Sequence, residues 1–584
     1  MTKTVRSSLL SAGLLLLPAL AAAAPSCRDL ESHLQAGGQA VAAMSVDTGR
    51  SGFNVYREAV AASLRKGQDE ATAARVEALA PDKPVPAEDA TLASCLLRRY
   101  TTARYGARIV RDLQQMVPFQ TFAQEGKTNW DAPEFVRQRE WLRQRTEELG
   151  LTFKSYDGRV EEITLPGASS NQAGPGPILA VLTHGDVQDV QNQQWSSPPW
   201  EGKLVGEGSE GRIVGRGTED DKGPIVATLY AMAALRDTGW PLAKTVRLLV
   251  ANAEESSWEE IPYYLERAPM PEMTFGVDAA YPVVHAQKGY GILTLRGPKV
   301  DTPPKKGVWV VTSMSGGSGM SIIPERGEAL VEAPSRYPEG AFTELQRRAA
   351  EWSAAHPPAR LTVSQEGAKF KVVAEGKGGH SSEPTSGHNA LSDLAAFLSS
   401  LDLRMDAWGA LASFVGNHVR TETDGRTLGI ATHDDGIGDL TVNLSFLQEL
   451  EGRPAAQINL RVPRGITNEE IQSRVTARAK AFSQKHDATV EVASALLSQP
   501  HWAPPEGKLV AGPARCLGGG HRHPRPPARH RRRHPGPPLQ GGVDFGPANG
   551  MERYRGHGPD EYLTVGELHR IAELTAAAIA KLAM

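Results

Sequence analysis

The chain lacks an excess of charge, a long apolar run and an even number of cysteines, and each absence excludes something. Its net charge of −3, with 22% charged residues, gives no indication of nucleic acid or anionic lipid as a partner. The apolar stretch near its start is interrupted by Pro18 and is short for a membrane span. Three cysteines cannot all pair within one chain. With 584 residues the chain is too long for one core, so we expect two or three domains.

The first residues have the pattern of a secretory signal. Lys3 and Arg6 precede the apolar stretch, and small residues follow at Ala19 and Ala21. We therefore expect residues 1–23 to be removed on export across the inner membrane. The mature protein would then be a soluble protein of the periplasm.

In an oxidising compartment the cysteines have two alternative states. Cys27 and Cys95 could pair and tie the start of the mature chain to a later helix, which would leave Cys516 over. Alternatively, all three are free thiols.

Strands and helices alternate from about residue 105 onward. Residues 177–183 and 245–250 are continuous apolar runs, as strands covered on both faces require. Helices are predicted over 108–116 and 132–149. Between the second of these and the first apolar run, strands are predicted over 151–156 and 160–165. This alternation predicts an α/β domain with a mostly parallel sheet flanked by helices.

The stretch GRGTEDDKGP, residues 215–224, lies between the two apolar runs. Its glycines and proline predict a turn, and the apolar residues 225–232 predict a buried helix that starts near Pro224. An isolated Asp-Asp pair is usually a solvated turn. Here it has other acidic clusters on both sides along the chain, which favours a functional role.

Those clusters follow the predicted strands. His184 and Asp186 come after the first apolar run, Glu254 and Glu255 after the second, and Asp278 in a third cluster. Gathering this many carboxylates without a cation would be costly, through desolvation and mutual repulsion. A pair of divalent ions removes that cost, because one carboxylate can bridge two ions about 3.5–4 Å apart. Imidazole and carboxylate ligands suit zinc and also tolerate manganese or cobalt.

The order and spacing of these motifs resemble the dinuclear zinc peptidase family. That family holds carboxypeptidases, aminoacylases, the ArgE and DapE deacylases and the PepV-like dipeptidases, to which this sequence is most similar. The resemblance runs from about residue 105 to the end. It implies that His184 and Asp278 hold one metal ion, that Glu255 and His557 hold the other, and that Asp220 bridges the two.

The same resemblance gives roles to two further acids. Asp186 would accept the second ring N–H of His184 and fix its tautomer. Glu254, beside a ligand, would be the general base that takes a proton from the metal-bound water and returns it to the leaving amine. The alternative is that Glu254 only supports the site or lies on the surface.

The alanine-rich residues 24–104 have the pattern of amphipathic helices and would form an added helical segment. The resemblance implies that a catalytic domain in two parts, 105–292 and 493–584, follows it. Between them, residues 293–492 would form an inserted α+β lid. A lid of this length resembles the PepV type, which covers the site within one chain, so we expect a monomer.

Two lid residues are candidates for substrate contacts. His380, in Gly-Gly-His-Ser-Ser, resembles the lid histidine that stabilises the oxyanion. Arg461, on a predicted strand before a proline, suits capture of a substrate carboxylate. The alternatives are a surface histidine in a glycine-rich turn and an ordinary strand-end arginine. Ser321 stands where the family usually has asparagine, which weakens any role for it.

Residues 512–542 do not fit the family. They are rich in arginine, proline and histidine and contain no acid, so they predict neither a strand nor a buried helix. A basic arm or a histidine-rich metal tract is one interpretation. Our hypothesis is a compensated reading-frame shift in a GC-rich gene, which resequencing would test.

Together these features predict an exported metallopeptidase that cleaves the amide bond of a dipeptide or short peptide with a free carboxylate. A deacylase or carboxypeptidase on the same scaffold is the near alternative. A metal- or peptide-binding protein impaired around residues 512–542 is the alternative from another class, and the intact Glu254 argues against it.

Overall fold

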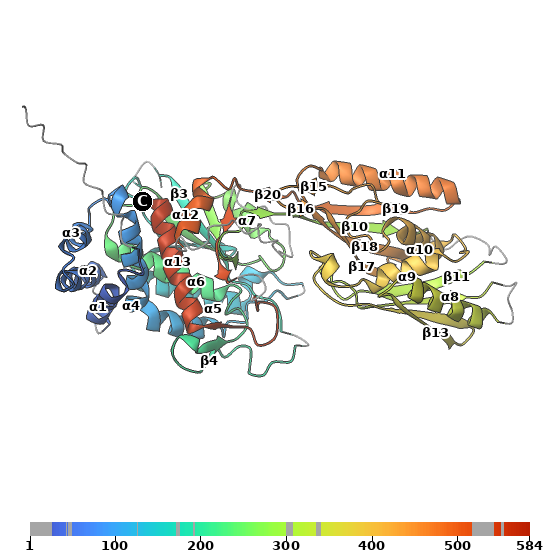
Figure 1. Cartoon of the computed structure of the whole chain (residues 1–584), viewed down its shortest axis with the longest axis horizontal. Coiled ribbons are helices and arrows are strands. Elements are labelled where there is room, and N and C mark those ends of the chain that lie inside the picture. Colours follow the sequence, from blue (N-terminus) through green and yellow to red (C-terminus); the bar gives the residue numbers. More distant parts are fainter. Residues whose placement is uncertain are drawn as a thin grey trace, which may run out of the picture.

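The computed structural model has two lobes, which lie side by side in Figure 1. It describes the residues in these ranges: 26–42, 44, 49–124, 126–170, 174, 176–190, 193–298, 308–334, 340–516, 542–549 and 554–584. The second lobe is built from residues 289–497, and the first lobe from the residues before and after them. The predicted signal, residues 1–23, and most of the anomalous segment lie outside the described residues.

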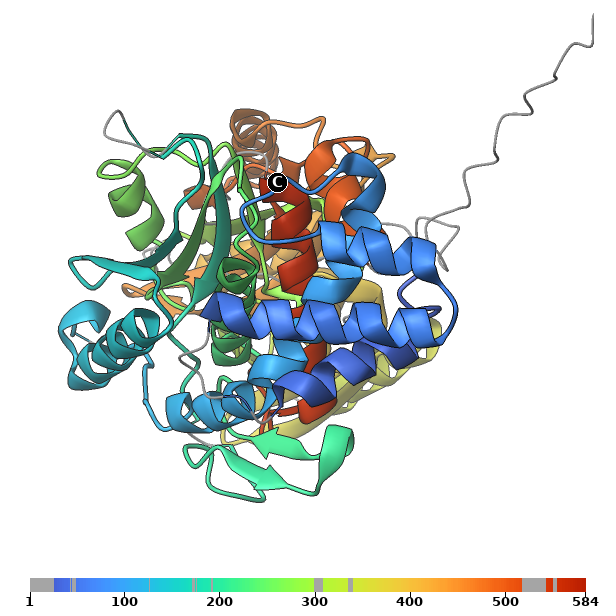
Figure 2. The ribbon, with the colours of Figure 1, turned by 90° about the vertical axis from the view of Figure 1, so that its left-hand side faces the viewer.

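The first lobe begins with four helices, seen in front in Figure 2: α1 (Glu31–Val41), α2 (Gly49–Lys66), α3 (Glu70–Ala78) and α4 (Ala90–Met116). A disulfide joins Cys27 to Cys95 and so ties the segment before α1 to α4, which confirms the first of the two predicted states. Helix α4 runs across residue 104 without a break, and the buried apolar side chains of all four helices belong to the same cluster as those of the sheet. The helical segment is therefore continuous with the core of the first lobe.

The sheet of this lobe has six strands in the order β1-β2-β6-β3-β7-β21. Their bounds are β1 Thr152–Tyr156, β2 Val160–Leu165, β3 Ile178–His184, β6 Thr245–Ala251, β7 Met273–Gly276 and β21 Val543–Asp544. Strands β6, β3, β7 and β21 are parallel, whereas β1 and β2 pair antiparallel at one edge. The mostly parallel sheet is confirmed.

Helices cover both faces of this sheet, which explains its continuous apolar strands. Alternate side chains such as Leu179 and Leu248 join the larger core, with α6 (Lys222–Thr238) and α13 (Val565–Ala583). The intervening Ala180 and Leu249 join a smaller core with α7 (Glu260–Leu265). Helix α5 (Pro133–Glu148) packs beside β1.

Helix α6 directly follows the Asp-Asp turn and is buried almost all round. It packs against α4, α13 and the sheet, so apolar residues are needed on every side. It ends at Gly239, whose φ of 66° is left-handed and suits glycine. The turn that carries Asp220 is therefore fixed to the centre of the lobe.

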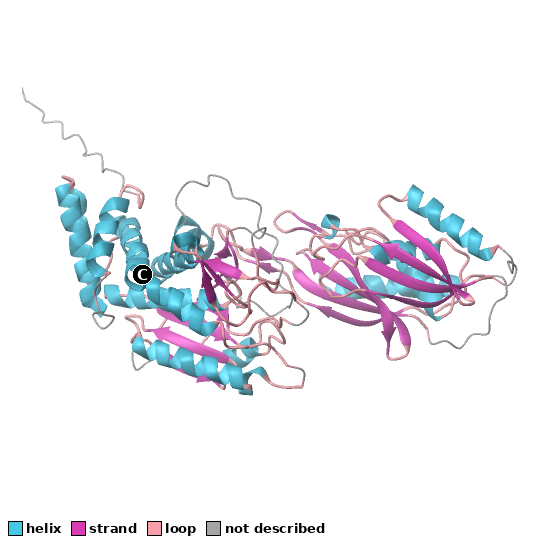
Figure 3. Cartoon of the chain, turned by 90° about the horizontal axis from the view of Figure 1, so that it is seen from below, coloured by secondary structure: helices cyan, strands magenta, loops and turns pink. Residues whose placement is uncertain are grey.

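The second lobe contains an eight-stranded antiparallel sheet in the order β13-β14-β12-β11-β17-β18-β10-β19. The strands are β10 Gly289–Arg296, β11 Val310–Gly316, β12 Arg326–Glu332, β13 Arg360–Glu366, β14 Lys369–Glu375, β17 Thr441–Leu450, β18 Arg453–Val462 and β19 Glu491–Leu497. The helices are α8 Ala341–Ala355, α9 Ala390–Ser399, α10 Ala407–His418 and α11 Asn468–His486. They share one core with the sheet, separate from that of the first lobe (Figure 3).

Short elements complete the chain. They are β4 Lys203–Val205, β5 Arg212–Val214, β8 Ala279–Ala280, β9 Ala286–Gln287, β15 His433–Asp434, β16 Gly438–Asp439, β20 His501–Trp502, β22 Pro547–Ala548, β23 Tyr562–Thr564 and α12 Lys508–Cys516. The pair β9–β20 lies where the chain passes between the lobes. Helix α12 extends into the first five residues of the anomalous segment, as far as Cys516, where the sequence predicts neither a strand nor a buried helix.

Candidate metal centre

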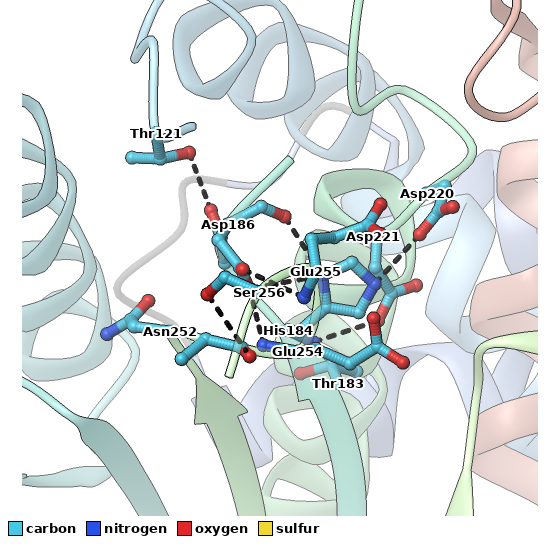
Figure 4. A network of polar contacts seen from close by, with 12 residues as sticks. Thr121, Thr183, His184, Asp186, Asp220, Asp221, Asn252, Glu254, Glu255 and Ser256 are labelled. Carbon is cyan, nitrogen blue, oxygen red and sulfur yellow. Dashed lines mark hydrogen bonds and ion pairs between the residues drawn. The ribbon is translucent and has the colours of Figure 1, made fainter. Parts of the chain in front are cut away.

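Five ionisable side chains from distant segments meet at the carboxyl edge of the first-lobe sheet, where part of the cluster is shown in Figure 4. His184 is the last residue of β3, Glu255 follows β6, and Asp278 follows β7. Asp220 lies in the turn before α6, and His557 precedes β23. All five are the residues that the sequence motifs singled out as metal ligands.

The first ligand group is His184, Asp220 and Asp278, whose ligand atoms lie within 4.8 Å of one another. His184 Nε2 is 2.8 Å from Asp220 Oδ1 and 3.9 Å from Asp278 Oδ1. One imidazole nitrogen and two carboxylate oxygens therefore face the same point.

The second ligand group is Asp220, Glu255 and His557, again within 4.8 Å. His557 Nε2 is 2.9 Å from Asp220 Oδ2 and 2.5 Å from Glu255 Oε1. Asp220 thus presents Oδ1 to the first group and Oδ2 to the second. This is the geometry that a carboxylate bridging two ions requires.

The charges of the cluster show why a cation fits it. Burial disfavours the charged imidazole of His184, but hydrogen bonds to Asp186 and Asp220 raise its pKa well above the ordinary value. Burial also opposes the charge on His557, and Glu255 and Asp220 nevertheless raise its pKa to about 10. The carboxylates therefore favour positive charge at this point of the lobe. Divalent ions would supply that charge with both imidazoles neutral, since metal ligands must be deprotonated.

Asp186 supports the cluster differently from the expectation. The atom nearest to His184 Nδ1 is the backbone carbonyl oxygen of Asp186, at 2.9 Å, whereas the carboxylate Oδ1 is 3.5 Å away. The carboxylate instead accepts hydrogen bonds from the backbone N–H groups of Glu254, at 3.1 Å, and Glu255, at 2.9 Å. Asp186 therefore aligns the imidazole and fixes the turn that carries the two glutamates.

Glu254 lies beside this cluster without being a member of either ligand group. It is half-buried and lines a small cavity together with His184 and Asp278. A half-buried carboxylate next to the ligands is placed to exchange a proton with a group held there.

Sequence reasoning missed the residues that hold Asp220. Glu561 Oε1 accepts the backbone N–H groups of Glu219, at 2.9 Å, and Asp220, at 3.2 Å, while Oε2 accepts from Arg216 Nη1 at 2.7 Å. Arg216 and Glu561 are both buried. The hydroxyl of Tyr554 donates to Asp220 Oδ2. Arg216 and Glu561 do lie inside the two motifs that carry Asp220 and His557, but the sequence does not show that they pair.

His380 and Arg461 are not in either ligand group, because both belong to the second lobe. His380 follows β14, and its Nδ1 is 2.7 Å from Ser382 Oγ. Arg461 lies in β18 over the ring of Tyr290, at 4.8 Å, and its Nη2 donates to Ser321 Oγ at 3.3 Å. Burial lowers the pKa of Arg461 to about 10. Ser321 is therefore a neighbour of Arg461, a contact that the sequence did not indicate.

Two further sequence predictions concern the anomalous segment and the absence of a membrane span. Residues 517–541 lie outside the described residues, so the reading-frame hypothesis for the anomalous segment stays a prediction. Among the helices that the structure describes, none is both long and apolar enough to cross a membrane.

Comparison with known proteins agrees with the motifs. "Putative dipeptidase YtjP" of Bacillus subtilis is 28% identical over 458 residues, which cover 75% of this chain and 88% of that protein. A protein named "Putative dipeptidase" in Staphylococcus aureus (strain N315) is 26% identical over 407 residues, covering 68% and 81%.

Solved structures that align with the chain include human carnosine dipeptidase 1, at 13% identity and a TM-score of 0.45, with 83% of this chain and 98% of that chain covered. The dipeptidase Dug1p of Saccharomyces cerevisiae aligns at 11% identity and a TM-score of 0.47, with 84% and 98% covered. The family model of peptidase family M20/M25/M40 matches residues 180–581, which include all five residues of the ligand groups. The chain belongs to peptidase family M20/M25/M40.

Proposed function

We propose that the protein is an exported two-metal dipeptidase. The observation that carries this is the placement of Asp220, which presents one carboxylate oxygen to each ligand group. Membership of the peptidase family supports the reaction class, and the names of the curated relatives support dipeptides as substrates.

Five residues would hold the two ions: His184, Asp220 and Asp278 for one, and Asp220, Glu255 and His557 for the other. Nitrogen and carboxylate ligands favour zinc, and manganese or cobalt would also bind. When bound, the ions would act as Lewis acids toward water and the substrate carbonyl.

The protein residues would then divide the remaining work. Glu254 would take a proton from the attacking water and return it to the leaving amine, which restores the base after each cycle. His380 would donate a hydrogen bond to the carbonyl oxygen as negative charge develops on it. Arg461 would pair with the carboxylate of the substrate, which favours short peptides with a free C-terminus. Because His380 and Arg461 lie in the second lobe, both steps need that lobe to act as a lid over the first.

The site of action follows from the start of the chain. The signal-like residues 1–23 support export to the periplasm, and the Cys27–Cys95 disulfide suits an oxidising compartment. The large single-chain lid supports a monomer.

The test is hydrolysis of a dipeptide panel by the purified mature chain with zinc, manganese or cobalt, beside Glu254→Gln. We expect metal-dependent turnover that the variant loses while it keeps both ions. Turnover of N-acyl amino acids in place of dipeptides would show a deacylase on the same scaffold. Full activity in Glu254→Gln would refute the assigned base.

A further inference from the structure

The two ligand groups share Asp220 but differ in how their other ligands are held. His184 and Asp278 directly end or follow the neighbouring strands β3 and β7, which are paired to each other. In the second group, His557 lies on the loop that precedes β23. A loop needs extra contacts to hold a ligand as precisely as a strand does.

Gln188 supplies such a contact to Glu255. Its side-chain Nε2 donates to Glu255 Oε2 at 2.7 Å, while Oε1 of the same carboxylate lies 2.5 Å from His557 Nε2. The amide therefore occupies one carboxylate oxygen and leaves the other turned toward the ligand group. Gln188 therefore fixes the rotation of the Glu255 carboxylate relative to His557.

Gln193, five residues further along the same loop, supplies the second contact. Its Nε2 donates to the backbone carbonyl oxygen of His557 at 2.8 Å. His557 has a φ of 67°, a left-handed conformation that non-glycine residues adopt at a cost. The bond from Gln193 stabilises this backbone conformation, which directs the imidazole toward Asp220 and Glu255.

The orientation of Gln193 is itself determined. Its Oε1 accepts from Arg216 Nη2 at 2.7 Å and from Trp195 Nε1 at 3.2 Å. Both are donors without acceptor capacity, so the oxygen must face them and the amide N–H must face His557. Arg216 in turn pairs with the buried Glu561, which connects Gln193 to the core of the lobe.

We propose that Gln188 and Gln193 are positioning residues for the second ligand group and set the affinity of its metal ion. This inference rests on the proposed two-metal function and adds an asymmetry between the two ions. The ion of the first ligand group binds independently of the glutamines. The ion of the second ligand group depends on them. Loss of a residue that orients a ligand typically lowers metal affinity by about 10- to 100-fold.

The test compares three variants of the full mature chain, each stripped of metal and titrated with Co²⁺ by calorimetry and visible absorption. Gln188→Met keeps the length of the side chain and removes its hydrogen bonds. Gln193→Glu keeps the acceptor for Arg216 and removes the donor to His557. Gln194→Met is the matched control, since Gln194 is exposed and has no hydrogen bond to any described residue.

We expect two cobalt equivalents in the wild type and in Gln194→Met. In the other two variants the first equivalent should bind unchanged, and the second should weaken about 10- to 100-fold with an altered absorption spectrum. The melting temperature of the metal-free variants should match that of the wild type, which separates positioning from loss of fold.

Other results would overturn the inference. Unchanged binding of both equivalents in Gln188→Met and Gln193→Glu would show that the glutamines do not position the ligands. Equal weakening of both equivalents would refute the asymmetry. A wild type that binds no pair of ions would instead refute the proposed function, so the two failures are distinguishable.

Discussion

The two lobes contribute to the site in different ways. The first lobe brings together side chains from residue 184 to residue 557 into one cluster whose geometry is complete within that lobe. The second lobe carries His380 in the segment after β14 and Arg461 in β18, where Arg461 contacts Tyr290 and Ser321 of the same lobe. Both ligand groups are thus complete within the first lobe, whereas the proposed substrate contacts come from the second.

The connection between the lobes is narrow. The ring of Trp502 in β20 lies 5.1 Å, between centroids, from the ring of His285 in the first lobe. The guanidinium of Arg464 in the second lobe lies over the same Trp502 ring, at 3.8 Å from its centroid. The apolar cores on either side are separate clusters. We therefore expect the lobes to differ in both function and stability.

The largest expected effect is at the residue shared by both ligand groups. Asp220→Ala should abolish stable binding of both ions and lower activity by roughly 10⁴-fold, because the metals supply several kcal/mol of transition-state stabilisation. Elemental analysis and dipeptide hydrolysis measure this. Retention of two ions by the variant would contradict the bridging role.

The disulfide should stabilise only the first lobe. Cys27 and Cys95 are 68 residues apart, and the chain-entropy relation assigns a loop of that length about 4 kcal/mol. In calorimetry, the double variant Cys27→Ser/Cys95→Ser should lower the transition of the first lobe and leave that of the second. A single transition that shifts as a whole would mean that the lobes unfold together.

The lid histidine should affect turnover without affecting metal. His380→Ala is expected to lower kcat by about 100- to 1,000-fold, the usual effect of removing one oxyanion donor. Its metal content should equal that of the wild type, in contrast to Asp220→Ala. Loss of metal in His380→Ala would show that the two lobes do not separate these roles.

A smaller effect concerns the pH dependence of the first lobe. Glu260 is fully buried, neither of its carboxyl oxygens has a hydrogen-bond partner among the described residues, and burial raises its pKa to about 8. Between about pH 4.5 and 8 the folded protein therefore holds a proton that the unfolded chain releases, so stability falls as the pH rises through this window.

Glu260→Gln removes that titration. The variant should gain about 4 kcal/mol in the free energy of unfolding at pH 8 relative to the wild type and little at pH 4.5. Denaturant unfolding of the first lobe at the two pH values measures the difference. An equal effect at both pH values would mean that Glu260 does not titrate in this range.

The fold could be predicted from the sequence where local pattern decides the structure. Continuous apolar runs gave β3 and β6, and the glycine-rich turn before an apolar helix gave the start of α6. The ligand residues could be singled out because each lies at a strand end or in a short motif. The structure then places all five within two overlapping groups.

What could not be predicted depends on contacts between distant residues. The buried pair Arg216–Glu561 joins positions far apart in the sequence, and no local pattern shows that it holds the backbone of Asp220. The partner of His184 Nδ1 is a backbone carbonyl, which sequence cannot distinguish from the neighbouring carboxylate. Gln188 and Gln193 are common loop residues whose bonds to Glu255 and His557 appear only in the folded chain.

The most direct test of the central claim is a crystal structure of the zinc-loaded mature chain with anomalous data. We expect two zinc ions about 3.5–4 Å apart, with the carboxylate of Asp220 between them and both ions within the first lobe. A single ion, or two ions that do not share Asp220, would contradict that claim.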